Sequence, residues 1–95
     1  MALEQYLRFS GFYSFKMAKT EQQLMQETQK WLSRIEKEMS KVKETGKNKD
    51  YIKNIKAYIL DCRHFEKQGK YILAFEAVVW AWAWLQILQE LKIID

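Results

Sequence analysis

The fold is decided by residues 61–85, which read DCRHFEKQGKYILAFEAVVWAWAWL. Gly69 divides this stretch into the end of one amphipathic helix and the beginning of a second, much more apolar helix. So short a connection makes the two helices antiparallel neighbours. The preceding part of the chain is suited to covering this hairpin.

The composition of the 95-residue chain favours a single all-helical domain. Hydrophobic residues make up 48% of the chain, which is enough for a core and argues against disorder. There is no proline, and the three glycines fall at positions 11, 46 and 69, so little interrupts a helix. The single cysteine, Cys62, excludes an internal disulfide and a cysteine-rich zinc site. It fits a reducing, cytoplasmic setting.

The pattern predicts three helices, over Thr20–Glu44, Asn48–Lys67 and Lys70–Lys92. Thr20 and Gln23 form a capping-box pattern at the start of the first helix, and Gly46 fits its C-cap. The predicted fold is all-α: a compact antiparallel bundle of three main helices over residues 20–95. Residues 1–19 are expected to form an N-terminal arm or a short helix.

Each predicted helix carries apolar residues at alternating steps of three and four, which is typical of helices packed in a bundle. The predicted buried stripes are Met25, Thr28, Leu32, Ile35, Met39 and Val42 in the first helix, Ile52, Ile55, Ile59 and Cys62 in the second, and Tyr71, Ala74, Val78, Ala81, Leu85 and Leu88 in the third.

The last helix is very apolar, but we do not expect it to span a membrane. Its uncharged run, Ala77–Gln89, holds 13 residues, whereas a membrane span needs about 20. The first fifteen residues contain one cationic side chain, Arg8, and scattered apolar residues, unlike a signal peptide. The sequence therefore predicts no transmembrane segment and a cytoplasmic location.

The last helix also carries a second apolar stripe, which two neighbouring helices cannot cover. Five large side chains left in water would forfeit about 1.5–3 kcal/mol each. A second copy of the chain, the N-terminal arm or an unknown protein partner could cover them, and we favour a homodimer. Association of the tryptophans with a membrane surface is a further alternative. The predicted interface residues are Trp80, Trp84, Ile87, Leu91 and Ile94.

The hairpin resembles a known family over residues 51–85. The matching features are Asp61, Phe65, Gly69-x-Tyr71, Ala74-Phe75-x-Ala77 and Trp80-Ala81-x-x-Trp84-Leu85. In these features the chain resembles the archaeal domain of unknown function 357 family. The resemblance implies a compact all-helical bundle and leaves the function open, because the function of that family is not established. The hairpin is also similar to tetratricopeptide and HEPN-type helix pairs, but a single unit excludes a solenoid.

Three polar residues form the one candidate for chemistry. Asp61 and His64 share a side of the second helix, and Glu76 lies roughly across from them among apolar neighbours. Two carboxylates and an imidazole could bind a metal or transfer a proton. The more ordinary interpretation is an ion pair or hydrogen bond from Glu76 to His64, Arg63 or a lysine. We therefore expect no enzyme activity, no metal and no cofactor.

Lysines gather around the first interhelical loop, at positions 41, 43, 47, 49, 53 and 56. A solvated basic face is the ordinary interpretation, and no known nucleic-acid-binding motif accompanies it. The predicted function is a small, non-catalytic helical interaction or assembly module that self-associates through its last helix. The alternative is a nucleic-acid-associated accessory protein, with candidate contacts at Lys43, Lys47, Lys49 and Lys53.

Overall fold

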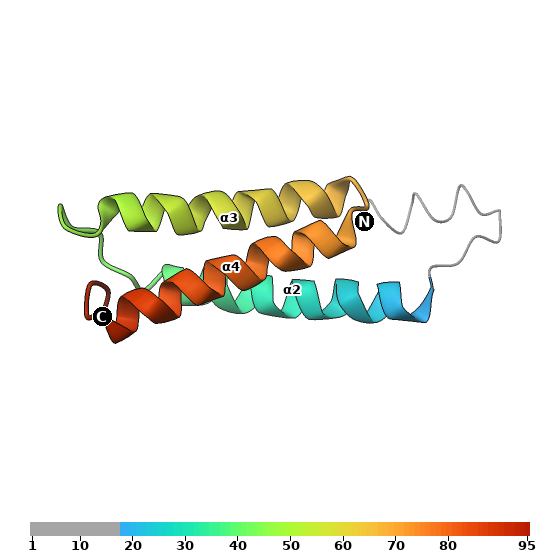
Figure 1. Cartoon of the computed structure of the whole chain (residues 1–95), viewed down its shortest axis with the longest axis horizontal. Coiled ribbons are helices and arrows are strands. Elements are labelled where there is room, and N and C mark those ends of the chain that lie inside the picture. Colours follow the sequence, from blue (N-terminus) through green and yellow to red (C-terminus); the bar gives the residue numbers. More distant parts are fainter. Residues whose placement is uncertain (1–17) are drawn as a thin grey trace.

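The computed structural model describes residues 18–95, so the arm predicted over residues 1–19 lies almost entirely outside the described residues. Three helices form the described part: α2 over Lys19–Met39, α3 over Lys49–Lys67 and α4 over Tyr71–Glu90. Successive helices run in opposite directions (Figure 1). The predicted all-α antiparallel bundle is confirmed.

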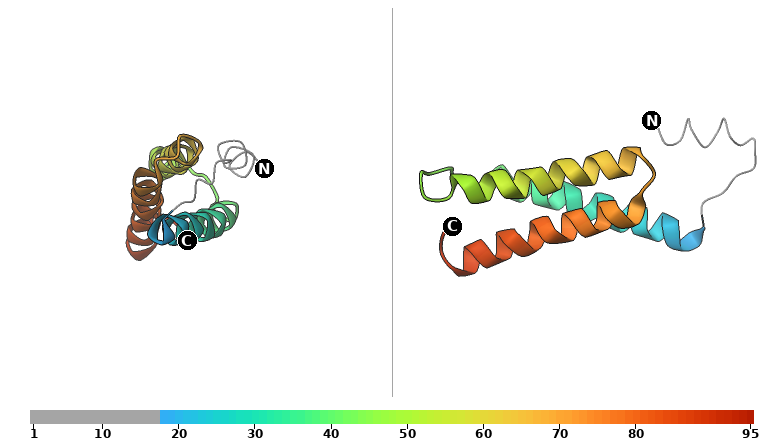
Figure 2. Two further views of the ribbon diagram at one scale, coloured as in Figure 1. Left: turned by 90° about the vertical axis from the view of Figure 1, so that its right-hand side faces the viewer. Right: turned by 45° about the horizontal axis from the view of Figure 1, so that its top comes forward.

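Helix α4 is the centre of the bundle. It packs along both α3 and α2, whereas α2 and α3 contact each other only slightly. Viewed from the end, α2 and α3 lie apart from each other on the side away from α4 (Figure 2). Any change on the buried side of α4 therefore affects the packing of both other helices.

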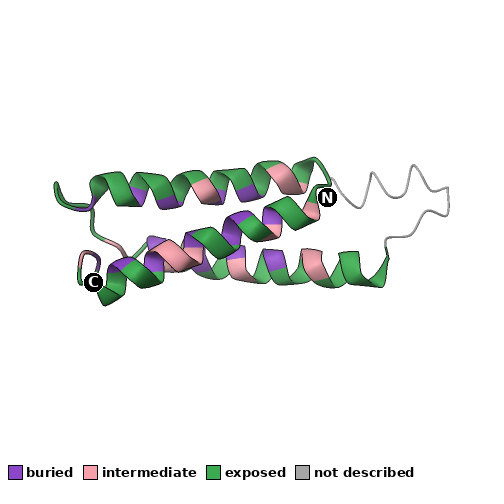
Figure 3. Cartoon of the chain, in the orientation of Figure 1, coloured by how far each residue is buried: buried purple, intermediate pink, exposed green. Residues whose placement is uncertain are grey.

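The buried side chains lie on the inward faces of the three helices (Figure 3). The stripes predicted for the helix centres are confirmed, because steps of three and four keep their members on one face. Ala74 and Ala81 are completely buried, and their small side chains let the neighbouring helices approach α4 closely. The buried helical residues are Thr28, Leu32, Ile35 and Met39 in α2, Ile52, Ile55, Ile59 and Cys62 in α3, and Ala74, Ala77, Val78, Ala81, Leu85 and Leu88 in α4.

The predicted boundaries of the first helix are wrong at both ends. It ends at Met39, with Ser40 as its C-cap, and does not continue to Glu44. Past Met39 the backbone tightens into turns, in which the Lys41 N–H donates to the Glu38 carbonyl and the Val42 N–H to the Met39 carbonyl, both at 3.1 Å. Asn48 then holds the following loop at Lys43 and Thr45. At the other end, Ala18 is the N-cap, and its backbone N–H donates to the Glu21 carboxylate at 3.2 Å.

Helices α3 and α4 end in the same hydrogen-bonded turn, the Schellman motif. After α3, Gly69 has φ +74° and the Lys70 N–H donates to the Phe65 carbonyl at 2.9 Å. After α4, Lys92 takes the left-handed position with φ +59°, and the Ile93 N–H donates to the Leu88 carbonyl at 2.9 Å.

The turn at Lys92 corrects the predicted end of the last helix. Helix α4 ends at Glu90 instead of Lys92, and the chain then reverses. Ile94, predicted to lie at an interface on the outer stripe, is instead 2% exposed within the core. The prediction failed because it extended the heptad spacing past the point where the helix stops.

Helix α4 is also the one helix of residues 18–95 that is long and apolar enough to cross a membrane. This is weak evidence, because the core helix of a soluble bundle has the same length and composition. A third of its most apolar window is buried against the rest of the protein.

Candidate interaction surfaces

The outer side of α4 presents a long apolar surface to solvent. Trp80 is 55% exposed, Ile87 48% and Leu91 64%. The surface follows the whole helix, a length of about 30 Å at 1.5 Å per residue. We call it the α4 apolar face; its exposed residues are Ile72, Leu73, Val79, Trp80, Ile87 and Leu91. Three of the five predicted interface residues belong to it, and a fourth, Trp84, is half-buried at its edge.

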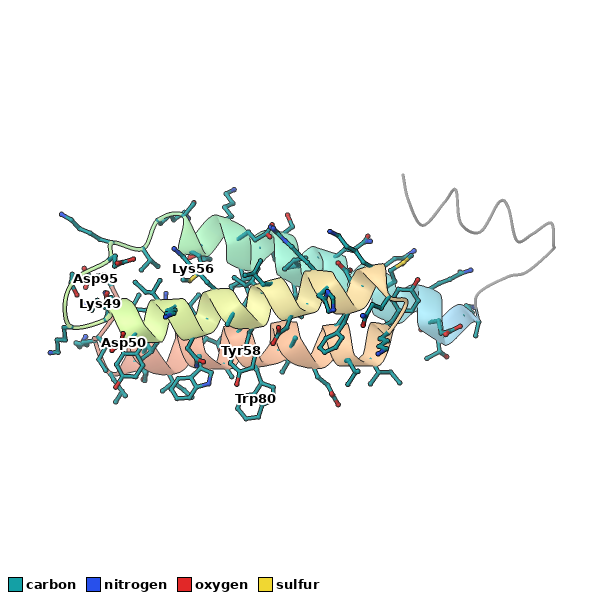
Figure 4. All side chains as sticks on the ribbon, turned by 90° about the horizontal axis from the view of Figure 1, so that it is seen from above. Lys49, Asp50, Lys56, Tyr58, Trp80 and Asp95 are labelled. Carbon is teal, nitrogen blue, oxygen red and sulfur yellow. The ribbon has the colours of Figure 1, made fainter. Side chains whose placement is uncertain are left out.

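Two tyrosines of α3 support the tryptophans of this face. The rings of Tyr58 and Trp80 stack with centroids 6.4 Å apart and planes 19° apart (Figure 4). Tyr51 and Trp84 form a second pair, with centroids 6.5 Å apart. Such pairs contribute about 0.5–1.5 kcal/mol beyond the area they bury. The tyrosines therefore fix the tryptophans in place while leaving Trp80 accessible to solvent.

Carboxylates occur along the α4 apolar face, and lysines stand at its two ends, at Lys70 and Lys92. Glu76 and Glu90 lie on α4 within one turn of exposed apolar residues, and Asp61 lies one turn from Tyr58 on α3. All three carboxylates are exposed. Helix α4 itself, from Tyr71 to Glu90, contains no lysine or arginine. This surface is thus apolar with carboxylates along its length, which does not favour anionic lipids or phosphates there.

The structure does not assemble Asp61, His64 and Glu76 into a metal-binding group. All three are exposed, and residues 18–95 contain no group of three His, Cys, Asp or Glu side chains placed to hold a metal. His64 Nε2 instead lies 3.1 Å from Gln68 Nε2. Glu76 does have apolar neighbours, as predicted, but they face solvent. A carboxylate there stays hydrated and needs no partner.

Known proteins share this sequence pattern and this fold. A family model described as a protein of unknown function (DUF357) matches residues 18–94. The chain belongs to the DUF357 family. A DUF357 protein from Archaeoglobus fulgidus, whose crystal structure is known, is 42% identical in sequence to this chain, and the two structures superpose with a TM-score of 0.75. The similarity covers 81% of this chain and 97% of that one, and the source of that relative suggests an archaeal origin. A comparison with curated proteins finds no match.

In this DUF357 chain, one hollow lies on the side of α4 that faces α2. It measures about 300 Å³, and Trp31 and Trp82 form much of its wall. The two rings meet edge to face at 5.7 Å, and the Trp82 indole N–H donates to the Trp31 carbonyl at 3.0 Å. The Arg34 guanidinium stacks 4.9 Å from the Trp31 ring. These contacts join α4 to α2, so we assign the pair a structural role.

The lysines predicted as one cluster divide between two hollows. Lys41, Lys43 and Lys47 border a hollow of about 290 Å³, which Asp95 also lines. Lys49, Lys53 and Lys56 border a larger one of about 590 Å³, next to Leu60. The acidic residues Glu44 and Asp50 line the larger hollow as well.

Asn48 is an important residue whose role the sequence reasoning missed. It is 3% exposed. Its side-chain oxygen accepts from the Thr45 N–H at 2.8 Å, and its amide group donates to the Lys43 carbonyl at 3.1 Å and the Ile93 carbonyl at 3.5 Å. Asn48 is the N-cap residue of α3, but its side chain forms no capping bond. It joins the first loop to the C-terminal turn of the chain.

Cys62 and Glu66 lie next to each other on the inward face of α3. Burial raises the pKa of the Cys62 thiol to about 12, so the thiol stays protonated and unreactive. This agrees with the prediction that Cys62 lies on the buried stripe of the second helix. Burial also raises the pKa of Glu66, against the opposing effect of Arg63. One Glu66 oxygen is buried without a hydrogen-bond partner. Glu66 follows Cys62 by four residues in the sequence, which places it on the buried stripe of α3. This spacing was the sequence signal for its burial.

Glu66→Gln is expected to raise the free energy of unfolding more at about pH 7 than at about pH 4. A carboxyl with a raised pKa stabilises the fold while it is protonated. That contribution is fully present below the ordinary pKa of 4.5 and is lost as the pH rises through the raised value. Urea unfolding at both pH values measures the difference. Glu90→Gln, on the exposed end of α4, is the control; an equal pH effect in the two variants would contradict the assignment.

Proposed function

We propose that this DUF357 protein is a non-catalytic assembly module that forms a homodimer through the α4 apolar face. The observation that carries the proposal is the exposure of Trp80, Ile87 and Leu91 on one continuous surface. Burying such area is favourable by roughly 25 cal/mol per Å². Stacking on Tyr58 holds Trp80 in place, so little side-chain freedom is lost on association. A cytoplasmic location is part of the proposal, since the single cysteine is buried and reduced.

The spacing of the face makes a second copy a suitable partner. Leu73, Trp80 and Ile87 follow one another at steps of seven and are all exposed. Two α4 helices that pack antiparallel about a two-fold axis at Trp80 would place Leu73 opposite Ile87 of the second copy. Trp80 would then contact Trp80 across the axis. Glu90 would lie near one end of the contact, whereas Glu76, between Leu73 and Trp80 on the helix surface, would lie within it and need water or a polar group there.

Trp80→Cys tests both the dimer and this register. Helices in contact have axes about 8–10 Å apart, which brings two residues on the axis within disulfide distance. Mild oxidation of Trp80→Cys is expected to yield a covalent dimer, seen on a non-reducing gel. Cys62 does not interfere, because it is buried with a raised pKa.

Leu91→Cys is the matched control, since Leu91, the C-cap of the same helix, is at least as exposed but far from the axis. It is expected to remain monomeric on the same gel. Equal cross-linking of the two variants would contradict the antiparallel register. Absence of cross-linking in both would contradict this register, whereas the dimer itself is tested on the wild type, because Trp80→Cys removes the central contact.

A further inference from the structure

The cationic side chains of α3 gather along one edge of that helix. Five of them recur at heptad-like spacing, with Leu60 at the one position that lacks a charge. All five are exposed. We call them the basic stripe: Lys49, Lys53, Lys56, Arg63 and Lys67.

The basic stripe lies on the edge of α3 that faces away from the aromatic pairs. Lys56 points to one side of α3, whereas Tyr58 and its partner Trp80 lie on the other (Figure 4). Arg63 forms an ion pair with Glu36 of α2, which places the stripe on the α2 side. The stripe and the α4 apolar face are therefore separate surfaces, and a dimer formed through α4 leaves the stripe exposed.

Most of this charge is not neutralised within the described part of the chain. Among residues 18–95, Lys49, Lys53, Lys56 and Lys67 form no ion pair, and only Arg63 has one. Glu44 and Asp50 border the hollow at the Lys49 end. From Lys53 onward, the other acidic residues of α3 lie elsewhere: Asp61 is near Tyr58 and Glu66 faces the interior. A net positive strip about 27 Å long remains.

We propose that the basic stripe binds the phosphate backbone of a nucleic-acid duplex. Lysines act on phosphate as flexible point charges and carry no base specificity. At 3.4 Å per base pair, a strip of this length follows about eight base pairs. Among residues 18–95, the tyrosines of α3 face α4 and Phe65 packs partly buried against the core, so His64 is the one ring of α3 beside the stripe. A single strand, which binds mainly by stacking of its bases, is therefore a poorer ligand than a duplex.

The test is the salt dependence of binding by the full chain to a short, fluorescently labelled DNA duplex. Four unpaired lysines predict a slope of log K against log[salt] of about −3.6, or roughly 100-fold weaker binding between about 50 and 200 mM salt. Lys53→Gln with Lys56→Gln is expected to reduce the slope to about −1.8. Circular dichroism checks that the variant is folded; if it is not, Lys49→Gln with Lys67→Gln replaces it.

Lys19→Gln with Lys37→Gln is the matched control, because it removes the same charge from exposed positions on α2 that form no ion pair among residues 18–95. Its slope is expected to equal that of the wild type. An equal loss in the control and the stripe variant would overturn the proposal, as would no binding at about 50 mM salt. Tighter binding to a single strand of the same sequence, or to polyglutamate, would overturn it in favour of stacking or an acidic protein partner.

Discussion

Leu85→Ala is expected to lower the free energy of unfolding by about 2–5 kcal/mol. Leu85 is completely buried, and it lies on α4, the helix that packs against both others. Removing its side chain leaves a cavity in the core, and the close packing of the interior limits collapse into it. Because a domain of this kind is stable by only about 5–15 kcal/mol, the variant should be close to unfolding at elevated temperature.

Leu60→Ala is the control for this experiment, since Leu60 is 62% exposed on α3. Its effect is expected to stay within about 0.5 kcal/mol, as for most surface substitutions. Urea unfolding of both variants gives the comparison. Equal losses in the two variants would mean that α4 is not the centre of the core.

Asn48→Asp is expected to destabilise the protein by about 2–4 kcal/mol, although the two side chains have nearly the same shape. The new carboxylate still accepts the Thr45 N–H, but it can no longer donate to the carbonyls of Lys43 and Ile93. It also places a negative charge beside two carbonyl oxygens at a buried position. Both the first loop and the C-terminal turn should loosen.

Amide hydrogen exchange of the Asn48→Asp variant should show faster exchange in the two segments that Asn48 joins, residues 40–48 and 91–95. Asn54→Asp, on the exposed side of α3, makes the same chemical change without this contact and should be nearly neutral. A loss that is equally large at both positions would contradict the role assigned to Asn48.

The helix centres could be predicted from the sequence because their spacing is a local property. Each helix repeats its apolar residues at steps of three and four, and residues at the centres of these stripes are buried, such as Thr28 and Ile35 in α2, Ile55 in α3 and Leu85 in α4. The end of α3 at Lys67, just before Gly69, was predicted correctly, but the ends of α2 and α4 were not, because no glycine marks the point where either helix stops. The loop after Met39 is held by Asn48, and the last turn depends on a left-handed Lys92 in place of the usual glycine.

The candidate surfaces were only partly predictable. The exposure of Trp80, Ile87 and Leu91 follows from geometry, because two neighbours cannot surround a helix that is apolar on nearly all sides. Glu76 shows the limit of this reasoning: apolar neighbours in the sequence do not reveal whether they face the core or water. The lysines were grouped by their closeness in the chain, whereas the structure groups them by helix edge, which adds Arg63 and Lys67 to the stripe.

In the proposed dimer, the α4 apolar face joins two copies of the chain. Light scattering of the wild type over a wide concentration range tests it most directly, together with Ile87→Glu and the exposed control Leu60→Glu. The wild type and the control should show twice the 11.5 kDa of one chain. Ile87→Glu should be a folded monomer, because dimerisation would bury its charge. A wild type that is monomeric at every concentration would contradict the account.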